Sequence, residues 1–143
     1  MTITQNNDTL QLLYSGFDKL ELSFKGIIPD NLLNLLGVSK SEASLINKEV
    51  LLQYKNPKYS LCRLNLHVAP TGARGGYAYQ FHTGEDGEIW WFKKNTDKGG
   101  WNIRCSVRAS ALAELGYEGV KRQLYERLKT MGCTVETESI SRI

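Results

Sequence analysis

Apolar and polar residues alternate along several short stretches of this chain, a pattern typical of β-strands with one buried side. In residues 17–24, Leu20, Leu22 and Phe24 fall on one side, and Gly26 is expected to end this first strand. The same alternation predicts five more strands, at residues 62–68, 77–82, 89–93, 101–107 and 134–143. Short, turn-rich segments separate the second to the fifth strand, so these four are expected to form an antiparallel meander.

Two segments carry helical patterning instead. The first begins near Asp30 and runs to about Gln53, as one long helix or two short ones rich in leucine. The second covers residues 118–131, and a short helical turn over residues 110–115 precedes it. Gly132 is well placed to end it. Its apolar residues recur at helical spacing and form one stripe, made of Val120, Leu124, Leu128 and Met131.

This order of strands and helices predicts an α+β fold. We expect a largely antiparallel sheet, with a meander of about four strands plus flanking strands, and two or three helices packed on one face. The 143 residues suit one domain, so a flexible tail is expected over residues 1–12 and a single domain over residues 13–143. No apolar run is long enough to span a membrane, and three widely spaced cysteines suit reduced thiols, so a cytoplasmic location is expected.

Residues with the spacing of a catalytic or metal site are scarce. His67 and His82, the only histidines, lie on separate predicted strands, and no cysteine or carboxylate at ligand spacing joins them. Glu85, Asp86 and Glu88 fall at a predicted hairpin turn, where solvated side chains are expected. The sequence therefore predicts no metal, no cofactor and no catalytic residue.

A basic and aromatic segment, residues 89–108, is the candidate binding surface. Its five cations stand against Asp97 alone, so +5 and −1 give +4. Cations position a phosphate backbone, and aromatic faces stack on unpaired bases. Alternation puts Trp90 and Phe92 on one side of a strand and Trp91 and Lys93 on the other, so part of the set is expected to fill the core. The candidate protein contacts are Trp91 and Trp101. The candidate nucleic-acid contacts include Arg74 in the glycine-rich loop 71–76, and the others are Lys93, Lys94, Lys98, Arg104 and Arg108.

Glycine and aromatic residues punctuate the predicted strands in a fixed order, at residues 75–81, 87–93 and 101–107. In that order these segments resemble the N-terminal part of the rolling-circle replication initiation proteins of plasmids and phages. Residues 17–25, 120–128 and 139–143 extend the resemblance over about residues 17–143. It implies a nicking and joining enzyme, in which a tyrosine attacks a DNA phosphodiester and acidic residues or histidines hold a divalent metal.

The chain ends at Ile143, where the family's acidic residue would follow, and the region with the tyrosine nucleophile is expected to be missing. We therefore expect DNA binding, to single-stranded or hairpin DNA, without nicking. The resemblance implies DNA contact at Lys93, Lys94 and Arg104. Two alternatives stay open: a plasmid- or phage-encoded inhibitor or regulator that blocks a host protein, as anti-defence proteins do, and an enzyme completed by self-association or by a second chain. A homodimer through the terminal strand is also expected, because an unpaired strand edge attracts another.

Overall fold

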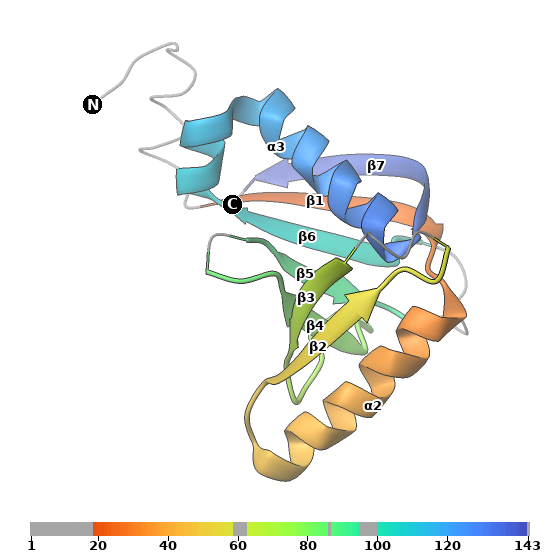
Figure 1. Ribbon diagram of the computed structural model, residues 1–143. Helices are drawn as coiled ribbons and strands as arrows, with labels where there is room; N and C mark the ends of the chain where they lie inside the picture. The colour runs from red at the N-terminus through yellow and green to blue at the C-terminus, as the bar shows by residue number, and fades with distance from the viewer. Residues whose placement is uncertain (1–18, 59–62, 86, 95–99, 143) are drawn as a thin grey trace.

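The computed structural model describes residues 19–58, 63–85, 87–94 and 100–142, which form two helices and one seven-stranded sheet (Figure 1). The predicted α+β class is confirmed. The predicted N-terminal tail, residues 1–12, lies outside the described residues. In chain order the elements are β1 (Lys19–Ile27), α2 (Asp30–Ile46), β2 (Val50–Lys55), β3 (Arg63–Val68), β4 (Tyr79–His82), β5 (Ile89–Phe92), β6 (Ile103–Arg108), α3 (Ala109–Met131) and β7 (Thr134–Arg142).

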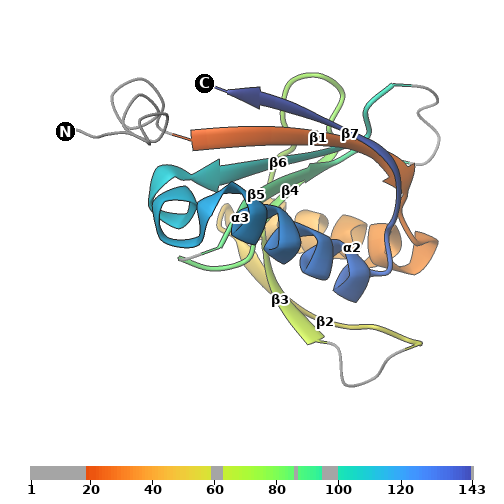
Figure 2. The same ribbon diagram turned by 90° about the horizontal axis from the view of Figure 1, so that it is seen from above.

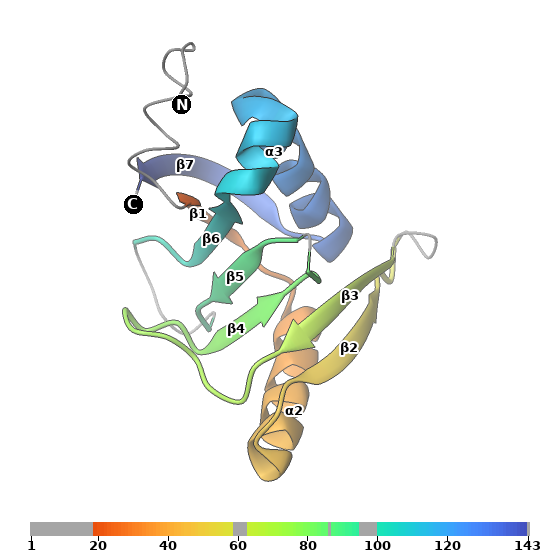
Figure 3. The ribbon, with the colours of Figure 1, turned by 90° about the vertical axis from the view of Figure 1, so that its left-hand side faces the viewer.

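The strands lie in the order β2-β3-β4-β5-β6-β1-β7, and every neighbouring pair is antiparallel. The strands β3 to β6 follow one another as the predicted meander (Figure 3). Beyond β6 lie β1 and β7, which come from opposite ends of the described chain. The first and last strands therefore complete one continuous sheet with the meander.

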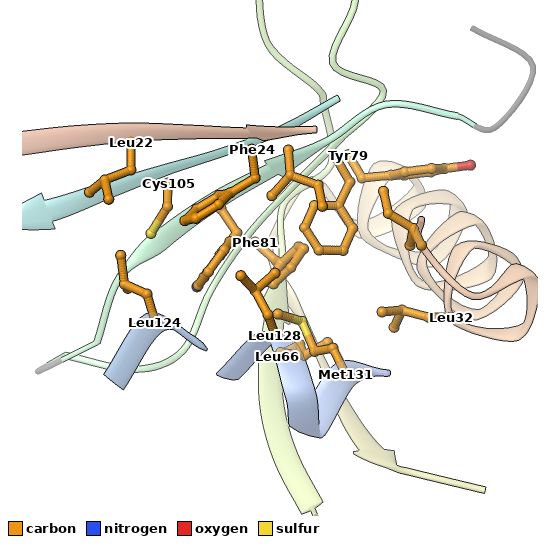
Figure 4. Packing of buried hydrophobic residues seen from close by; sticks show 14 of the residues in the cluster. Leu22, Phe24, Leu32, Leu66, Tyr79, Phe81, Cys105, Leu124, Leu128 and Met131 are labelled. Atoms are coloured by element: carbon orange, nitrogen blue, oxygen red, sulfur yellow. The ribbon is translucent and has the colours of Figure 1, made fainter. Parts of the chain in front are cut away.

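Both helices lie on the same side of the sheet, and Figure 2 shows them below β1, β6 and β7. Alternate side chains of β1, β3, β4, β5 and β6 point toward the helices and supply most of the sheet's part of one buried core. In Figure 4, Leu22, Phe24 and Cys105 of the sheet face Leu124 and Leu128 of α3. The alternation predicted for β5 is confirmed, because Trp90 and Phe92 are fully buried in this core.

The segment after α2 differs from the prediction. The sequence predicts helix to about Gln53, but α2 ends at Ile46 and Asn47 adopts a left-handed backbone conformation with φ of 54°. Asparagine tolerates this conformation better than most residues, so it ends the helix here. The next residues form β2, which pairs with β3 along its whole length and directs Tyr54 into the core.

Strand β1 continues past Gly26, which the sequence predicts as its end. The pairing with β7 shifts between Lys25 and Gly26, and a Cβ atom on Gly26 would lie 2.1 Å from the carbonyl oxygen of Thr134. On the other side, the side-chain oxygen of Asn102 accepts a hydrogen bond from the Gly26 N–H (3.0 Å), and its amide donates to the Gly26 carbonyl (2.8 Å). The Asn102 side chain thus stands in for a backbone partner at the irregularity.

Helix α3 begins directly after β6 and kinks at Gly116, where φ is 72° and ψ is 170°. This kink divides it as predicted, into a short first part and a long second part. Gly132 ends it in the left-handed conformation, with φ of 81°. The predicted stripe is buried: Val120, Leu124, Leu128 and Met131. Within the described chain, neither helix has the length and apolar character needed to cross a membrane.

Candidate functional site

The sheet face opposite the helices, here called the open face, has no helix over it among the described residues. Strand alternation places four polar or aromatic side chains on this face in one row across β4, β5, β6 and β1. In order along the row they are Gln80, Trp91, Arg104 and Ser23. A sheet surface with an aromatic and a guanidinium group suits stacking against unpaired bases.

Trp91 and Arg104 form a stacked pair in this row, here called the Trp91–Arg104 platform. The guanidinium carbon lies 4.9 Å from the centroid of the indole ring, and Trp91 Nε1 donates a hydrogen bond to Gln80 Oε1 (3.0 Å). Arg104 donates from Nη2 and Nε to Glu21 Oε1, at 2.7 and 3.2 Å, and Glu21 is only 6% exposed. These partners hold both planes in place, so the platform is ordered before any ligand arrives.

Cations outnumber carboxylates on the open face. Lys93 is held with its Nζ 5.2 Å from the centroid of the Tyr77 ring. The Tyr77 hydroxyl is protonated at neutral pH, as tyrosine ordinarily is, and burial raises its pKa further, so it adds no negative charge beside Lys93. By alternation and register, the open face carries Lys25, Lys55, Arg63, Lys93, Arg104 and Arg108 against Glu21 and Glu49.

The structure brings together only some of the predicted nucleic-acid contacts. Lys94 faces the helix side, where it lines a hollow with Lys40 and Ser41 of α2. Arg74 is exposed in the loop between β3 and β4, and Lys98 lies outside the described residues. Those that share the open face are Lys93, Arg104 and Arg108.

Exposed apolar side chains gather on α2 rather than around the predicted protein contacts. Trp91 is partly buried in the platform, and Trp101 is 39% exposed. Helix α2 exposes four apolar residues at helical spacing, with Leu45 at 87%: Leu35, Val38, Leu45 and Ile46. A surface for a protein partner is therefore better developed on α2 than at either tryptophan.

A cluster of titratable side chains lies on the open face beside the start of β2. His67 and His82 are direct cross-strand partners in β3 and β4, with parallel rings whose centroids are 4.6 Å apart. Glu49 joins them: its carboxylate lies 2.9 Å from His82 Nε2 and 3.6 Å from His67 Nδ1. The only sequence signal for this cluster was the expected pairing of the two histidine strands, because Glu49 is 33 residues away from His82.

Glu88 is buried, which corrects the expectation of a solvated turn residue. It is 2% exposed and accepts hydrogen bonds from Trp90 Nε1 (3.1 Å), Gln123 (2.8 Å), Arg127 (3.3 Å) and the Thr83 hydroxyl (3.2 Å). Two of these donors, Gln123 and Arg127, come from α3. Glu88 therefore fastens the β4–β5 hairpin to α3 and takes no part in the open face.

A groove of about 740 Å³ lies between the start of α2 and the end of α3, and Cys133 contributes to its wall. Burial raises the pKa of the Cys133 thiol to about 12. Burial likewise raises the pKa of Cys105 well above its usual range. Since the thiolate is the reactive form, burial disfavours the reactive state of both cysteines.

No model of a known protein family matches this chain, and no curated protein or solved structure matches it either.

Proposed function

We propose that this chain is a cytoplasmic, DNA-binding domain derived from a plasmid or phage replication initiator, and that it binds through the open face. The observation that supports this most is the Trp91–Arg104 platform, set in a sheet surface with an excess of cations. Positive side chains attract the phosphate backbone, and the platform offers a face on which a base can stack. No nicking chemistry is proposed for the chain alone.

Single-stranded DNA, or the loop of a DNA hairpin, fits this surface better than a duplex. Stacking requires a base whose face is free, and in a duplex both faces are already covered by neighbouring bases. Recognition by stacking and phosphate contacts depends little on base sequence. The proposed ligand is therefore an unpaired DNA segment, held across β4, β5 and β6.

Fluorescence anisotropy of labelled single-stranded, hairpin and duplex DNA at low and moderate salt tests this proposal. We expect single-stranded and hairpin DNA to bind more tightly than duplex, with an affinity that falls as salt rises. Trp91→Leu should weaken binding to single-stranded DNA by about tenfold, in the range of a lost stacking contact of roughly 1–3 kcal/mol. Failure of any DNA to bind at low salt would overturn the proposal.

Two double charge reversals are compared, one on the open face and one on α3, and the second serves as the matched control. Lys93→Glu with Arg63→Glu changes the open face, whereas Arg122→Glu with Lys129→Glu makes the same charge change on exposed positions of α3. We expect the first pair to abolish binding and the second to retain most of it. Equal losses in both would mean that net charge, rather than the open face, determines the binding.

The chain alone should leave supercoiled DNA intact in the presence of Mg²⁺. If a separate polypeptide supplies the nicking chemistry, relaxed product should form only when that polypeptide is added. Nicking by the chain alone, lost on substitution of one of its own tyrosines, would refute the non-catalytic proposal.

Binding to a host protein is the second candidate function, and the exposed apolar residues of α2 favour it. An inhibitor of the anti-defence type would block its target sterically through such a surface. Apolar contacts depend little on ionic strength, so binding should persist at high salt. It should be lost in Leu45→Ser with Ile46→Ser and kept in Lys93→Glu with Arg63→Glu. The reverse pattern would assign the function to the open face.

A further inference from the structure

We propose that Glu49, His67 and His82 form a binding site for a divalent transition-metal ion, Zn²⁺ in particular. The site would bring two imidazole nitrogens and one carboxylate oxygen together on the open face, a ligand set that zinc accepts. This inference does not depend on the proposed DNA binding.

The three donor groups already lie close together. One ligand atom from each residue falls within 4.8 Å of the other two. In a tetrahedral zinc site with bonds of about 2.0–2.1 Å, the donor atoms lie about 3.3 Å apart. The side chains of the two histidines are 31% and 34% exposed and that of Glu49 is 51% exposed, so small rotations of their side chains can close the difference.

The backbone holds the ligands on neighbouring elements of the sheet. His67 and His82 are cross-strand partners on β3 and β4, while Glu49 directly precedes Val50, which pairs with Val68 on β3. The two histidine positions are therefore fixed by backbone pairing rather than by a mobile loop. Ligands placed on paired strands lose little conformational freedom when a metal binds.

The number and exposure of the ligands indicate an open type of site. Among the described residues, the group consists of Glu49, His67 and His82, with no fourth protein ligand. Three protein ligands leave one tetrahedral position for water or an oxygen from another molecule, whereas structural zinc sites use four protein ligands. One carboxylate also offsets half of the charge of a divalent ion.

One hydrogen bond of His82 must break before its Nε2 can bind a metal. His82 Nδ1 accepts from the N–H of Gly84 (3.1 Å), which assigns the ring proton to Nε2, facing Glu49. A metal at Nε2 displaces this proton and requires the other ring nitrogen to carry one, so the Gly84 N–H must turn away. We therefore expect weaker binding than at a four-ligand structural site.

Zinc titration of the full chain, freed of any histidine tag, against a chromophoric chelator tests the proposal. We expect one equivalent of Zn²⁺ to bind, and His67→Ala, His82→Ala or Glu49→Gln to weaken the binding by tenfold or more. Glu85→Gln, an exposed carboxylate on the β4–β5 hairpin, serves as the matched control and should bind zinc as the parent does. Circular dichroism checks folding, and His67→Asn and His82→Asn replace any alanine variant that fails this check.

Three results would overturn the proposal. The first is the lack of one-equivalent binding by the parent protein at tens of micromolar. The second is binding that survives removal of the two histidines and the glutamate together. The third comes from Co²⁺ as a spectroscopic substitute: a thiolate-to-metal charge-transfer band would assign the ion to cysteines instead. Cobalt bands typical of nitrogen and oxygen ligands, lost in His82→Asn, would support the site.

Discussion

At the scale of single residues, a buried carboxylate ties the β4–β5 hairpin to α3. Glu88 accepts hydrogen bonds from four protein donors and is closed off from solvent. A buried charge is tolerated only when such partners surround it, because the low dielectric of the core penalises an isolated ion. Its removal would take away the acceptor of the hydrogen bonds from Arg127 and the Trp90 indole.

Glu88→Ala should therefore lower the free energy of unfolding by about 3 kcal/mol, as expected for breaking a buried, charge-assisted network. Urea denaturation followed by tryptophan fluorescence measures this change. The control is Glu85→Ala on the same hairpin, whose exposed side chain should contribute less than about 0.5 kcal/mol. If the two variants unfold at the same urea concentration, the network has no net stabilising effect.

Tyr125 links α3 to β7 by a hydrogen bond from its hydroxyl to Glu138, which also forms an ion pair with Lys121 at 2.8 Å. Burial and this hydrogen bond raise the pKa of Tyr125 to about 12, against an ordinary value of about 10 in the unfolded chain. The native state therefore holds this proton more tightly than the unfolded state does. The stability that Tyr125 contributes is complete below pH 10 and is lost as the pH rises toward 12.

Tyr125→Phe should consequently remove part of the alkaline loss of stability. Denaturant unfolding of parent and variant at several pH values from 8 to about 12 measures the difference between them. We expect the parent to be the more stable protein below pH 10, and the two curves to approach each other above it. A difference that stays constant across the range would contradict the raised pKa.

At the scale of elements, the junction of β6, β1 and β7 depends on one side chain. Asn102 supplies both hydrogen bonds that Gly26 makes toward β6, at the point where β1 shifts its register against β7. Asn102→Ala should lower the free energy of unfolding by about 1–3 kcal/mol, the sum of two hydrogen bonds at a partly buried position. The measurement is urea denaturation.

Asn65→Ala is the control for this junction, since Asn65 is exposed on β3 and its loss should change stability by less than about 0.5 kcal/mol. Hydrogen exchange adds a local readout. In Asn102→Ala we expect faster exchange for amides of β1 and β7, while amides of β2 keep their protection. Uniformly faster exchange would mean that the junction is not a local feature.

Most elements could be predicted because their pattern is local. A strand with one face in the core alternates with period two, and this signal placed Trp90 and Phe92 inside and Trp91 outside. The alternation of β2 is masked by the continuous run Val50-Leu51-Leu52, which follows a leucine-rich helix. Asn47, in a left-handed conformation, marks the break between α2 and β2. This conformation depends on the chain turning back so that β2 pairs with β3, which the local sequence does not show.

The candidate sites could be predicted only in part because their contacts are distant in sequence. Arg104 pairs with Glu21, 83 residues away, and Arg127 pairs with Glu88, 39 residues away. A single sequence carries no signal for such pairs. Strand alternation put Lys93 on the open face, but it also sends the adjacent Lys94 to the helix side. Counting the charges of a segment therefore overestimates the charge that one surface presents.

At the scale of the whole molecule, the two edges of the sheet are protected to different degrees. Strand β2 has six residues and packs against α2. Strand β7 has nine residues and, within the described part of the chain, pairs with β1 alone. Among the described residues, nothing pairs with its outer edge. A long edge with free backbone groups is a template for another strand.

We expect two copies of this chain to pair through β7 in an antiparallel, two-fold arrangement that extends the sheet across the dimer. Sedimentation velocity over a concentration series should show a reversible monomer–dimer equilibrium. Thr137→Lys with Ser139→Lys puts added charge on the open-face side of β7 in both copies, and like charges facing each other across paired strands destabilise the pairing.

The same added charge elsewhere distinguishes edge pairing from a general effect of charge. Ser41→Lys with Ser110→Lys changes exposed positions at α2 and at the start of α3, so this variant should dimerise as the parent does. Because the edge is formed by backbone groups, the dimer should also persist at salt concentrations that abolish DNA binding. A parent protein that remains monomeric at hundreds of micromolar would contradict the expectation. The edge of β7 would then be blocked by its own twist and side chains, as edge strands of many monomeric proteins are.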